Sequence, residues 1–296
     1  MPSPSPNALI IGASGQDGYY LAETCRAAGM EPVTISRSSG VLSGDVADYN
    51  FVSTAVKRHA PEMIFHLAAN STTGHDALFE NHAAIATGAL NILESVYRLK
   101  LASKVFLAGS GVQFQNTGAP ISEETPFEAK SPYAVSRIQS VYAARYYRTL
   151  GVRAYVGYFF HHESPLRKPA HLSQKIATSA KRISQGSNEI LEVGKLSVRK
   201  EWTFAGDTAK GVMALVQQER FWEAVIGSGE AHSIQDWIDV CFSHLGLDWR
   251  KHVRETEGFR PEYDILVSDP KRIFGLGWRP TTGFSQLAEM MVKAAR

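Results

Sequence analysis

The sequence predicts a mixed α/β fold in which helices cover both faces of a parallel sheet. Two observations carry this prediction. Apolar runs of four to six residues alternate with amphipathic stretches through the first half of the chain, and a glycine-rich segment follows the first of these runs. Strands buried on both faces have continuous apolar sequences, and strands that alternate with helices are typical of βαβ units. The expected architecture is therefore a Rossmann-like, doubly wound parallel sheet.

The elements are assigned in chain order. Strands are expected at residues 8–11, 32–35, 63–67, 104–108 and 153–157. Helices are expected between them at residues 16–28, 48–59, 81–98 and 132–150. After about residue 160 the pattern changes to a basic helix at 172–185, short strands at 190–193 and 224–226, and a helix at 284–295. We assign residues 7–160 mainly to the sheet domain and 161–296 mainly to a smaller C-terminal lobe, with the chain crossing between them.

Composition is that of a globular chain of one or two domains. Of 296 residues, 44% are hydrophobic and 20% are charged, and the net charge is +2 with both signs spread along the chain. No nucleic-acid partner and no membrane span are therefore expected. Residues 1–6 are expected to form a disordered tail. The two cysteines, Cys25 and Cys241, fit a reducing cytoplasm and suggest neither a disulfide framework nor a metal site.

The glycine-rich segment places Gly12, Gly15 and Gly18 between the first expected strand and the first expected helix. Glycines allow a tight turn and let a pyrophosphate approach the backbone, where it accepts hydrogen bonds from the N-terminus of the helix. The same spacing also fits an ordinary strand–helix turn.

The end of the second expected strand bears on the choice of dinucleotide. An acidic residue there would bind the ribose hydroxyls of NAD, but Arg37 and Ser38 stand in this place. They suit a ribose 2′-phosphate and therefore NADP, although a solvated loop arginine is the alternative. Asp45 follows soon after, where its carboxylate either accepts from the adenine amino group or lies exposed in a loop.

A candidate catalytic group lies at the start of the helix expected at 132–150. Ser131 and Pro132 form a good helix start, and Tyr133 and Arg137 are four residues apart on one helical face. Ser110 ends the preceding strand, and strand ends of this kind line the crevice of a doubly wound sheet. A nearby cation favours the phenolate form of a tyrosine, which can relay a proton as hydride moves. A tyrosine and a basic residue at this spacing are also common on surface helices.

Further motifs are spread along the chain. They are Gln16-Asp17-Gly18, Arg37-Ser38-Ser39, His66-Leu67-Ala68-Ala69, Ser131-Pro132-Tyr133-Ala134, Phe160-His161-His162-Glu163-Ser164-Pro165, Arg199-Lys200-Glu201-Trp202, Phe259-Arg260-Pro261-Glu262 and Leu276-Gly277-Trp278-Arg279-Pro280. With these motifs the chain resembles, over nearly its whole length, the extended short-chain dehydrogenase/reductase family. Within that family it most resembles the GDP-mannose 4,6-dehydratase group.

The resemblance implies an NADP-binding Rossmann domain, a nucleotide-sugar-binding lobe and a set of site residues. The implied catalytic residues are Ser110, Tyr133 and Arg137. The implied cofactor contacts are Gly12, Ser14, Gly15, Gln16, Asp17, Gly18, Arg37, Ser38, Asp45, Val46, Leu67, Ala68, Ala69, Ala108, Tyr133 and Arg137. The implied substrate contacts are Ser110, His161, Lys175, Lys200, Arg260 and Glu262. Basic side chains suit a sugar diphosphate. Without the resemblance, Lys175 and Lys200 are solvated charges, and His161, which replaces a family asparagine, is a packed loop histidine.

The chain departs from the group's pattern at three places. Arg137 replaces the family lysine; it keeps the charge but is planar and larger. Val112 replaces the glutamate that serves the dehydratases as acid/base, and valine cannot transfer a proton. The segment 40–45 is short where the group has a longer insert that helps build a tetramer. We therefore expect a homodimer formed through the helices 81–98 and 132–150.

The expected function is hydride transfer at C4 of a GDP-sugar, or of another nucleotide-diphosphate sugar. NADP is the expected cofactor, and NAD fits less well. A 4-keto reductase or an epimerase needs Ser110, Tyr133 and a cation but no glutamate. One alternative is a 4,6-dehydratase with a rearranged acid/base, served by His66, His161 or His162. Another is a nucleotide-sugar-binding pseudoenzyme, since the glutamate and the lysine are both replaced.

Overall fold

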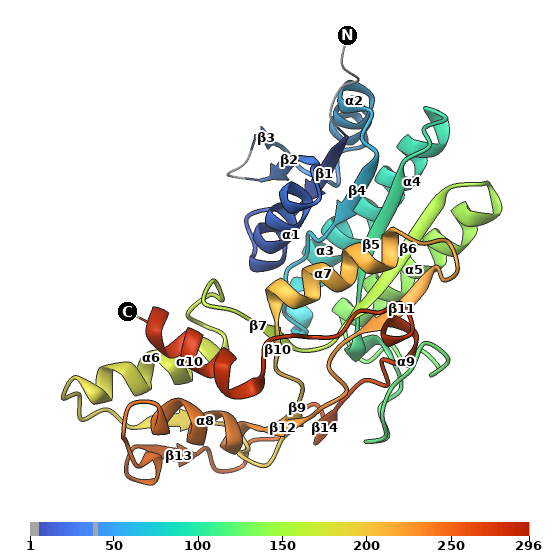
Figure 1. Ribbon diagram of the computed structural model, residues 1–296. Coiled ribbons are helices and arrows are strands. Elements are labelled where there is room, and N and C mark those ends of the chain that lie inside the picture. The colour runs from blue at the N-terminus through green and yellow to red at the C-terminus, as the bar shows by residue number, and fades with distance from the viewer. Residues whose placement is uncertain (1–5, 38–40, 296) are drawn as a thin grey trace.

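A seven-stranded parallel sheet forms the centre of the protein (Figure 1). The computed structural model describes residues 6–37 and 41–295, so residues 1–5 of the expected tail and Ser38 lie outside the described residues. The strands, in spatial order, are β11 (Glu223–Ile226), β6 (Arg153–Phe159), β5 (Lys104–Ser110), β4 (Met63–His66), β1 (Asn7–Ile11), β2 (Glu31–Ser36) and β3 (Leu42–Ser43). The order reverses between β1 and β4, which is where doubly wound sheets bind ligands. The predicted fold class is confirmed.

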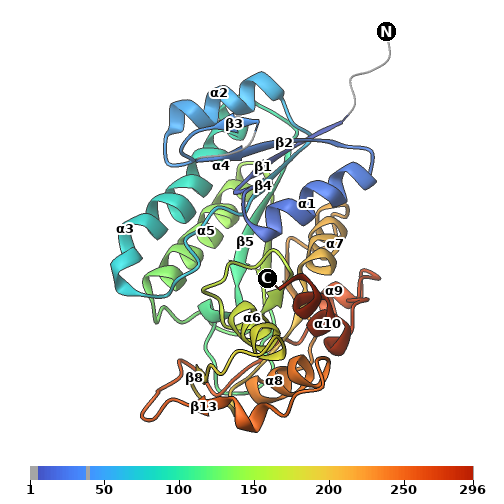
Figure 2. The same ribbon diagram turned by 90° about the vertical axis from the view of Figure 1, so that its left-hand side faces the viewer.

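Helices cover both faces of the sheet (Figure 2). On one face lie α2 (Tyr49–His59), α4 (Gly88–Arg98) and α5 (Pro132–Thr149); on the other lie α1 (Gln16–Ala27) and α7 (Ala205–Val216). Successive strand residues point to opposite faces. Leu9 therefore packs with the first group of helices and Ile10 with the second.

Local sequence signals explain where two of these helices begin. The Asp48 carboxylate accepts from the first backbone N–H groups of α2, and the Ser131 hydroxyl accepts from Ala134 N in α5. The single helix expected at 81–98 is wrong in detail. It consists of α3 (Leu78–Asn81), a π-helical stretch (His82–Thr87) and α4. The apolar pattern runs through all three segments, so it does not reveal the wider turn.

The C-terminal lobe is built around α6 (Leu172–Ser184), α8 (Ile234–Ser243) and α10 (Phe284–Ala294) (Figure 1). These helices enclose an apolar core that includes the buried Trp237 of α8. Short strand pairs complete it: β7 (His162–Glu163) with β10 (Thr203–Phe204), β8 (Leu191–Val193) with β13 (Val253–Glu255), and β9 (Arg199–Lys200) between β12 (His232–Ser233) and β14 (Ile265–Leu266). The short helix α9 (Lys271–Phe274) lies beside β11.

The strand expected at 224–226 does not belong to this lobe, contrary to the sequence analysis. It is part of β11, which pairs in parallel with β6 at the edge of the central sheet. The helix before it, α7, covers the same sheet, so residues 205–226 form a further crossover unit of the Rossmann domain.

A buried carboxylate joins α5 to this edge of the sheet. The Glu223 carboxylate accepts hydrogen bonds from Arg145, Arg148 and the Tyr158 hydroxyl, at 2.6–3.0 Å. Burial acts to raise the pKa of Glu223, but the hydrogen bonds from these three residues outweigh it and lower the pKa from 4.5 to about 2. The network therefore stabilises the fold only while Glu223 is ionised.

Replacing Glu223 by glutamine should lower the free energy of unfolding at pH 7 by about 2–3 kcal/mol, because it leaves two arginines without their counter-charge. The folded-state pKa lies below the unfolded one, so this stabilisation is present above pH 4.5 and is lost as the pH falls towards 2. Urea unfolding at pH 7 and pH 3 measures both effects. The exposed Glu289→Gln is the control, and an equal loss at pH 7 in both variants would contradict the prediction.

Candidate active site

The glycine-rich loop connects β1 to α1 and fits a bound dinucleotide. Gly12 has a φ of +92°, and a Cβ on it would lie 2.6 Å from the backbone nitrogen of Ala68. A Cβ on Gly18 would lie 2.4 Å from Cα of Ala13. Gly15 differs, since the nearest atom to an added Cβ is 3.6 Å away and no described side chain caps the helix that follows it. The loop therefore presents exposed backbone and free helix N–H groups to an anion.

The first turn of α1 is bound to the crossover into the C-terminal lobe. Gln16 donates to the His162 carbonyl at 3.2 Å and accepts from the Ser164 hydroxyl at 2.8 Å. Asp17 Oδ1 lies 2.8 Å from His162 Nε2. Burial opposes the charge of both partners, but each holds the other ionised, so the pKa of Asp17 is lowered and that of His162 is raised. Gln16 and Asp17 thus act as structural links beside the loop.

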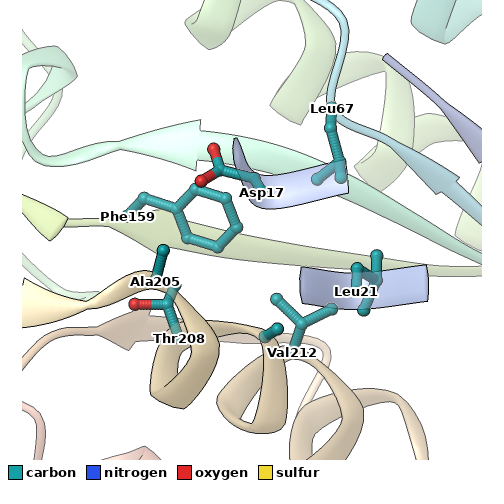
Figure 3. A pocket seen from close by; sticks show the side chains of 8 residues that line it. Asp17, Leu21, Leu67, Phe159, Ala205, Thr208 and Val212 are labelled. Carbon is teal, nitrogen blue, oxygen red and sulfur yellow. The ribbon is translucent and has the colours of Figure 1, made fainter. Parts of the chain in front are cut away.

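A small cavity lies between α1, α7 and the sheet (Figure 3). Its volume is about 10 Å³, which is roughly the space of one water molecule. Asp17, Phe159 and Thr208 are among its lining residues. It cannot hold a dinucleotide or a sugar, so the candidate site is the outer surface of the glycine loop, next to the exposed Ser14.

Several residues expected to contact the cofactor follow β3 and β4. Residues 67–69 follow β4 directly. Val46 is buried, and its carbonyl accepts from Asn91 at 2.9 Å. Asp45 is exposed, and its carboxylate accepts from the backbone N–H of Ala47 at 2.9 Å, so it shapes its own turn.

Arg37 directly follows β2, as expected, but it already has a partner. Its Nη2 lies 3.0 Å from Oε1 of Glu80, whose other carboxylate oxygen accepts from Asn70 at 2.8 Å. This pair was not predictable from the motifs, because Glu80 is distant in sequence and belongs to none of them.

The candidate catalytic residues meet at the carboxyl end of β5. Arg137 is 4% exposed, and its guanidinium donates to the Ala108 carbonyl and lies under the Tyr133 ring, 5.0 Å from the ring centroid. Its Nε is buried with no hydrogen-bond partner among the described residues. Tyr133 itself is partly exposed. Arg137 therefore provides a positive charge beside the tyrosine from within the protein.

Ser110 is the last residue of β5 and caps the short helical turn Gly111–Gln113. Its hydroxyl accepts from the Gln113 backbone, and its own N–H donates to the Gln113 side chain at 2.8 Å. Within residues 6–37 and 41–295 the Ser110 proton has no acceptor. The hydroxyl is thus oriented and can donate to an incoming oxygen.

No carboxylate occupies the position of the dehydratase glutamate. Val112 is partly buried and packs against the core. The next acidic residues along the chain have structural partners. Glu123 accepts from Val225 N at 2.7 Å, and Glu124 pairs with Arg272. Neither is available as a replacement base.

The three histidines considered as replacement acids differ in their surroundings. Burial and the nearby Arg137 lower the pKa of His66 to about 4, and the side chain is 1% exposed. Both ring nitrogens of His162 are hydrogen-bonded, to Asp17 and to a backbone carbonyl. Burial and the neighbouring Lys200 lower the pKa of His161, which is therefore neutral, yet its side chain is one-third exposed. Among these three, His161 alone combines accessibility with a free ring nitrogen.

A buried charge cluster surrounds Lys200 in the C-terminal lobe. Glu163 accepts from Arg167 and from the Ser173 hydroxyl, both at 2.7 Å. Lys200 is 6% exposed, with its ammonium 4.5 Å from the centroid of the Trp202 ring, and it forms no hydrogen bond or ion pair with a described residue. Burial lowers its pKa to about 8, against the effect of Glu163. A buried cation without a hydrogen-bonded counter-ion suits an anionic ligand.

The other expected substrate residues are more exposed. Lys175 donates to the Glu192 carbonyl at 2.8 Å, so its ammonium is engaged within the lobe. Arg260 is exposed. Glu262 accepts from the hydroxyl of Thr73, which lies in the loop after β4. Glu262 therefore joins the C-terminal lobe to the cofactor side.

Solved structures share this architecture. RMD from Pseudomonas aeruginosa, complexed with NADPH, aligns with a TM-score of 0.86 at 19% identity, covering 98% of each chain. UDP-glucose 4-epimerase from Thermus thermophilus, in complex with NAD, aligns with a TM-score of 0.84 at 19% identity, covering 97% of this chain and 98% of the other. These likenesses show the fold class, a Rossmann-like parallel sheet with a smaller C-terminal lobe.

Sequence relatives narrow this class. The family described as GDP-mannose 4,6 dehydratase matches residues 37–291. GDP-mannose 4,6 dehydratase 1 of Arabidopsis thaliana is 32% identical, covering 98% of this chain and 89% of the relative. GDP-mannose 4,6-dehydratase of Sinorhizobium fredii is 30% identical, covering 97% and 95%. The chain belongs to the GDP-mannose 4,6-dehydratase family, so the resemblance found in the sequence is confirmed.

Neither a membrane-spanning helix nor a metal-binding cluster occurs in the described residues. In that part of the chain, no helix has the length and apolarity needed to cross a bilayer. Among the same residues, no three His, Cys, Asp or Glu side chains are grouped so that they could bind a metal ion.

Proposed function

We propose that the protein transfers hydride at C4 of a GDP-sugar, as a 4-keto reductase or an epimerase that uses NADP. The glycine loop and Arg37 would hold the dinucleotide, whose nicotinamide supplies or accepts the hydride when bound. Tyr133 protonates or deprotonates the C4 oxygen, and Ser110 donates a hydrogen bond to the same oxygen. Arg137 provides a positive charge beside the Tyr133 ring. Lys200 binds the sugar diphosphate.

The observation that carries this proposal is the contrast between two positions at the end of β5. Ser110 is oriented and its proton has no acceptor in the described part of the chain, whereas two residues later Val112 packs against the core. Hydride transfer at C4 needs the hydroxyl and the tyrosine but no further base. Elimination of water across C5 and C6 needs a carboxylate that this position lacks.

A second candidate, 4,6-dehydration of GDP-mannose, is favoured by the family match over residues 37–291. In this chain the accessible, neutral His161 is the residue that could replace the missing acid/base. The third hypothesis, a pseudoenzyme, predicts binding without turnover. It is disfavoured by the retained Ser110 and Tyr133, beside which Arg137 still supplies a positive charge.

The deciding experiment compares two substrates by mass spectrometry. The protein is incubated with GDP-mannose, and separately with GDP-4-keto-6-deoxymannose plus NADPH. A gain of two hydrogens on the keto sugar, with NADPH consumed, is the expected result. Loss of water from GDP-mannose would instead establish the dehydratase and overturn the reductase. Binding of NADPH and GDP-sugar with no product in either reaction would support the pseudoenzyme.

Because the pKa of Lys200 is lowered, we expect substrate binding to depend on pH. With a pKa of about 8, the Lys200 side chain of the ligand-free protein is mostly protonated at pH 7 and mostly neutral at pH 9. Only the protonated form attracts a diphosphate, so binding of GDP should weaken about tenfold between these pH values. Calorimetric titration with GDP at pH 7, 8 and 9 measures the change. Lys200→Arg keeps its charge throughout and should bind equally at all three; the same loss in this variant would contradict the assignment.

We also propose that the chain forms a homodimer through α4 and α5. The two helices pack side by side and expose Leu90, Tyr97, Tyr142 and Tyr146 to solvent. Exposed apolar groups clustered on one face favour burial in an interface. Sedimentation velocity of the wild type and of Tyr146→Arg tests this.

A cytoplasmic location suits the two cysteines, which are buried and unpaired.

A further inference from the structure

Arg37, which the proposed function assigns to the dinucleotide, is paired with Glu80, which has no role in that proposal. Arg37 Nη2 lies 3.0 Å from Glu80 Oε1, and Asn70 Nδ2 donates to Glu80 Oε2 at 2.8 Å. The carboxylate is thus held from two sides. Hydrogen bonds from Asn70 and Arg37 lower the pKa of Glu80, so the group is ionised at neutral pH.

The three residues come from three segments that meet beyond the carboxyl ends of β2 and β4. Arg37 directly follows β2, Asn70 lies in the loop after β4, and Glu80 lies in α3. The side chain of Arg37 is 70% exposed and that of Glu80 is 41% exposed, so a ligand can reach both. An exposed pair of this kind contributes little to stability, and the arginine can exchange partners at low cost.

We infer that Glu80 sets cofactor selectivity by competing for Arg37 with a ribose 2′-phosphate. This inference rests on the proposed function, because it requires that the dinucleotide binds with its adenosine at this end of the sheet. A 2′-phosphate needs the guanidinium donors that Glu80 now occupies, and its charge is repelled by the same carboxylate. NADH lacks this phosphate, so it neither has to displace Glu80 from Arg37 nor is repelled by the Glu80 carboxylate. Glu80 therefore reduces the preference for NADPH over NADH that Arg37 alone would give.

The test is the dissociation constant of NADPH and of NADH, measured by calorimetry at low salt. Unit charges a few ångströms apart in water change an equilibrium constant by about fivefold. Glu80→Gln should therefore tighten NADPH binding about three- to tenfold and leave NADH binding within about twofold. In 0.5 M salt the gain should largely disappear, since the charges are exposed and screened. A steric or structural effect would not depend on salt.

Two further variants make the result specific. Glu23→Gln removes another exposed carboxylate of the same domain that is paired with an arginine, and it should change neither constant. In an Arg37→Gln background, Glu80→Gln should produce no gain, because Glu80 acts through Arg37. A gain that persists there, or an unchanged NADPH to NADH ratio in Glu80→Gln, would overturn the inference. If the wild type bound neither dinucleotide, the proposed function itself would fall.

Discussion

Replacing Tyr133 by phenylalanine is expected to lower kcat by about 10²–10⁴-fold, the usual contribution of a positioned acid/base. The substitution removes only the hydroxyl, and the ring that lies over Arg137 is retained. The dissociation constant of NADPH should therefore change little. Turnover is followed by NADPH absorbance with the keto sugar, and dinucleotide binding by calorimetry.

Tyr142→Phe is the matched control, because Tyr142 lies on the same helix and its side chain is exposed. It should keep wild-type turnover. If Tyr133→Phe also kept wild-type turnover, the proton would have to come from another group. Among the residues described at the site, the accessible His161 would then be tested as its source.

Replacing Gly12 by alanine is expected to destabilise the fold by about 2–5 kcal/mol, from backbone strain and a steric clash together. Its φ of +92° is unfavourable for alanine, and the new Cβ would meet the backbone of Ala68 at 2.6 Å. The backbone on both sides must then move, so dinucleotide binding should be lost as well. Thermal unfolding and NADPH titration measure the two effects.

Gly15→Ala distinguishes the effect of the loop on protein stability from its effect on NADPH binding. The nearest atom to the new Cβ is 3.6 Å away, so stability should change by less than about 1 kcal/mol. The methyl group would, however, stand where a pyrophosphate approaches, so NADPH binding should weaken about tenfold or more. Equal NADPH affinity in Gly15→Ala and the wild type would contradict the placement of the pyrophosphate.

Features set by neighbouring residues were predictable from the sequence. The turn at Gly12, the helix starts at Asp48 and Ser131, and the pairing of Tyr133 with Arg137 all depend on residues within a few positions. The five strands and most helices of the first half follow from apolar periodicity for the same reason. The π-helical stretch at His82–Thr87 was missed, because it leaves that periodicity unbroken.

Contacts between distant segments were not predictable. Glu223 meets Arg145 across 78 residues, and Glu80 meets Arg37 across 43. Such pairs form only when the folded sheet brings their helices and strands together. They are therefore not marked by any local pattern in the sequence. The strand at 224–226 was assigned to the wrong part of the fold for the same reason, since its partner β6 ends more than 60 residues earlier.

The link between Asp17 and His162 has a consequence for domain motion. The first turn of α1 and the crossover into the C-terminal lobe are joined there by four hydrogen-bonding side chains, three of them buried. A second contact between the sheet domain and the lobe, from Thr73 to Glu262, is a single exposed hydrogen bond. We expect the Thr73–Glu262 contact to open more readily than the buried one, so that a sugar nucleotide enters and leaves on the Thr73 side while the glycine loop keeps its shape.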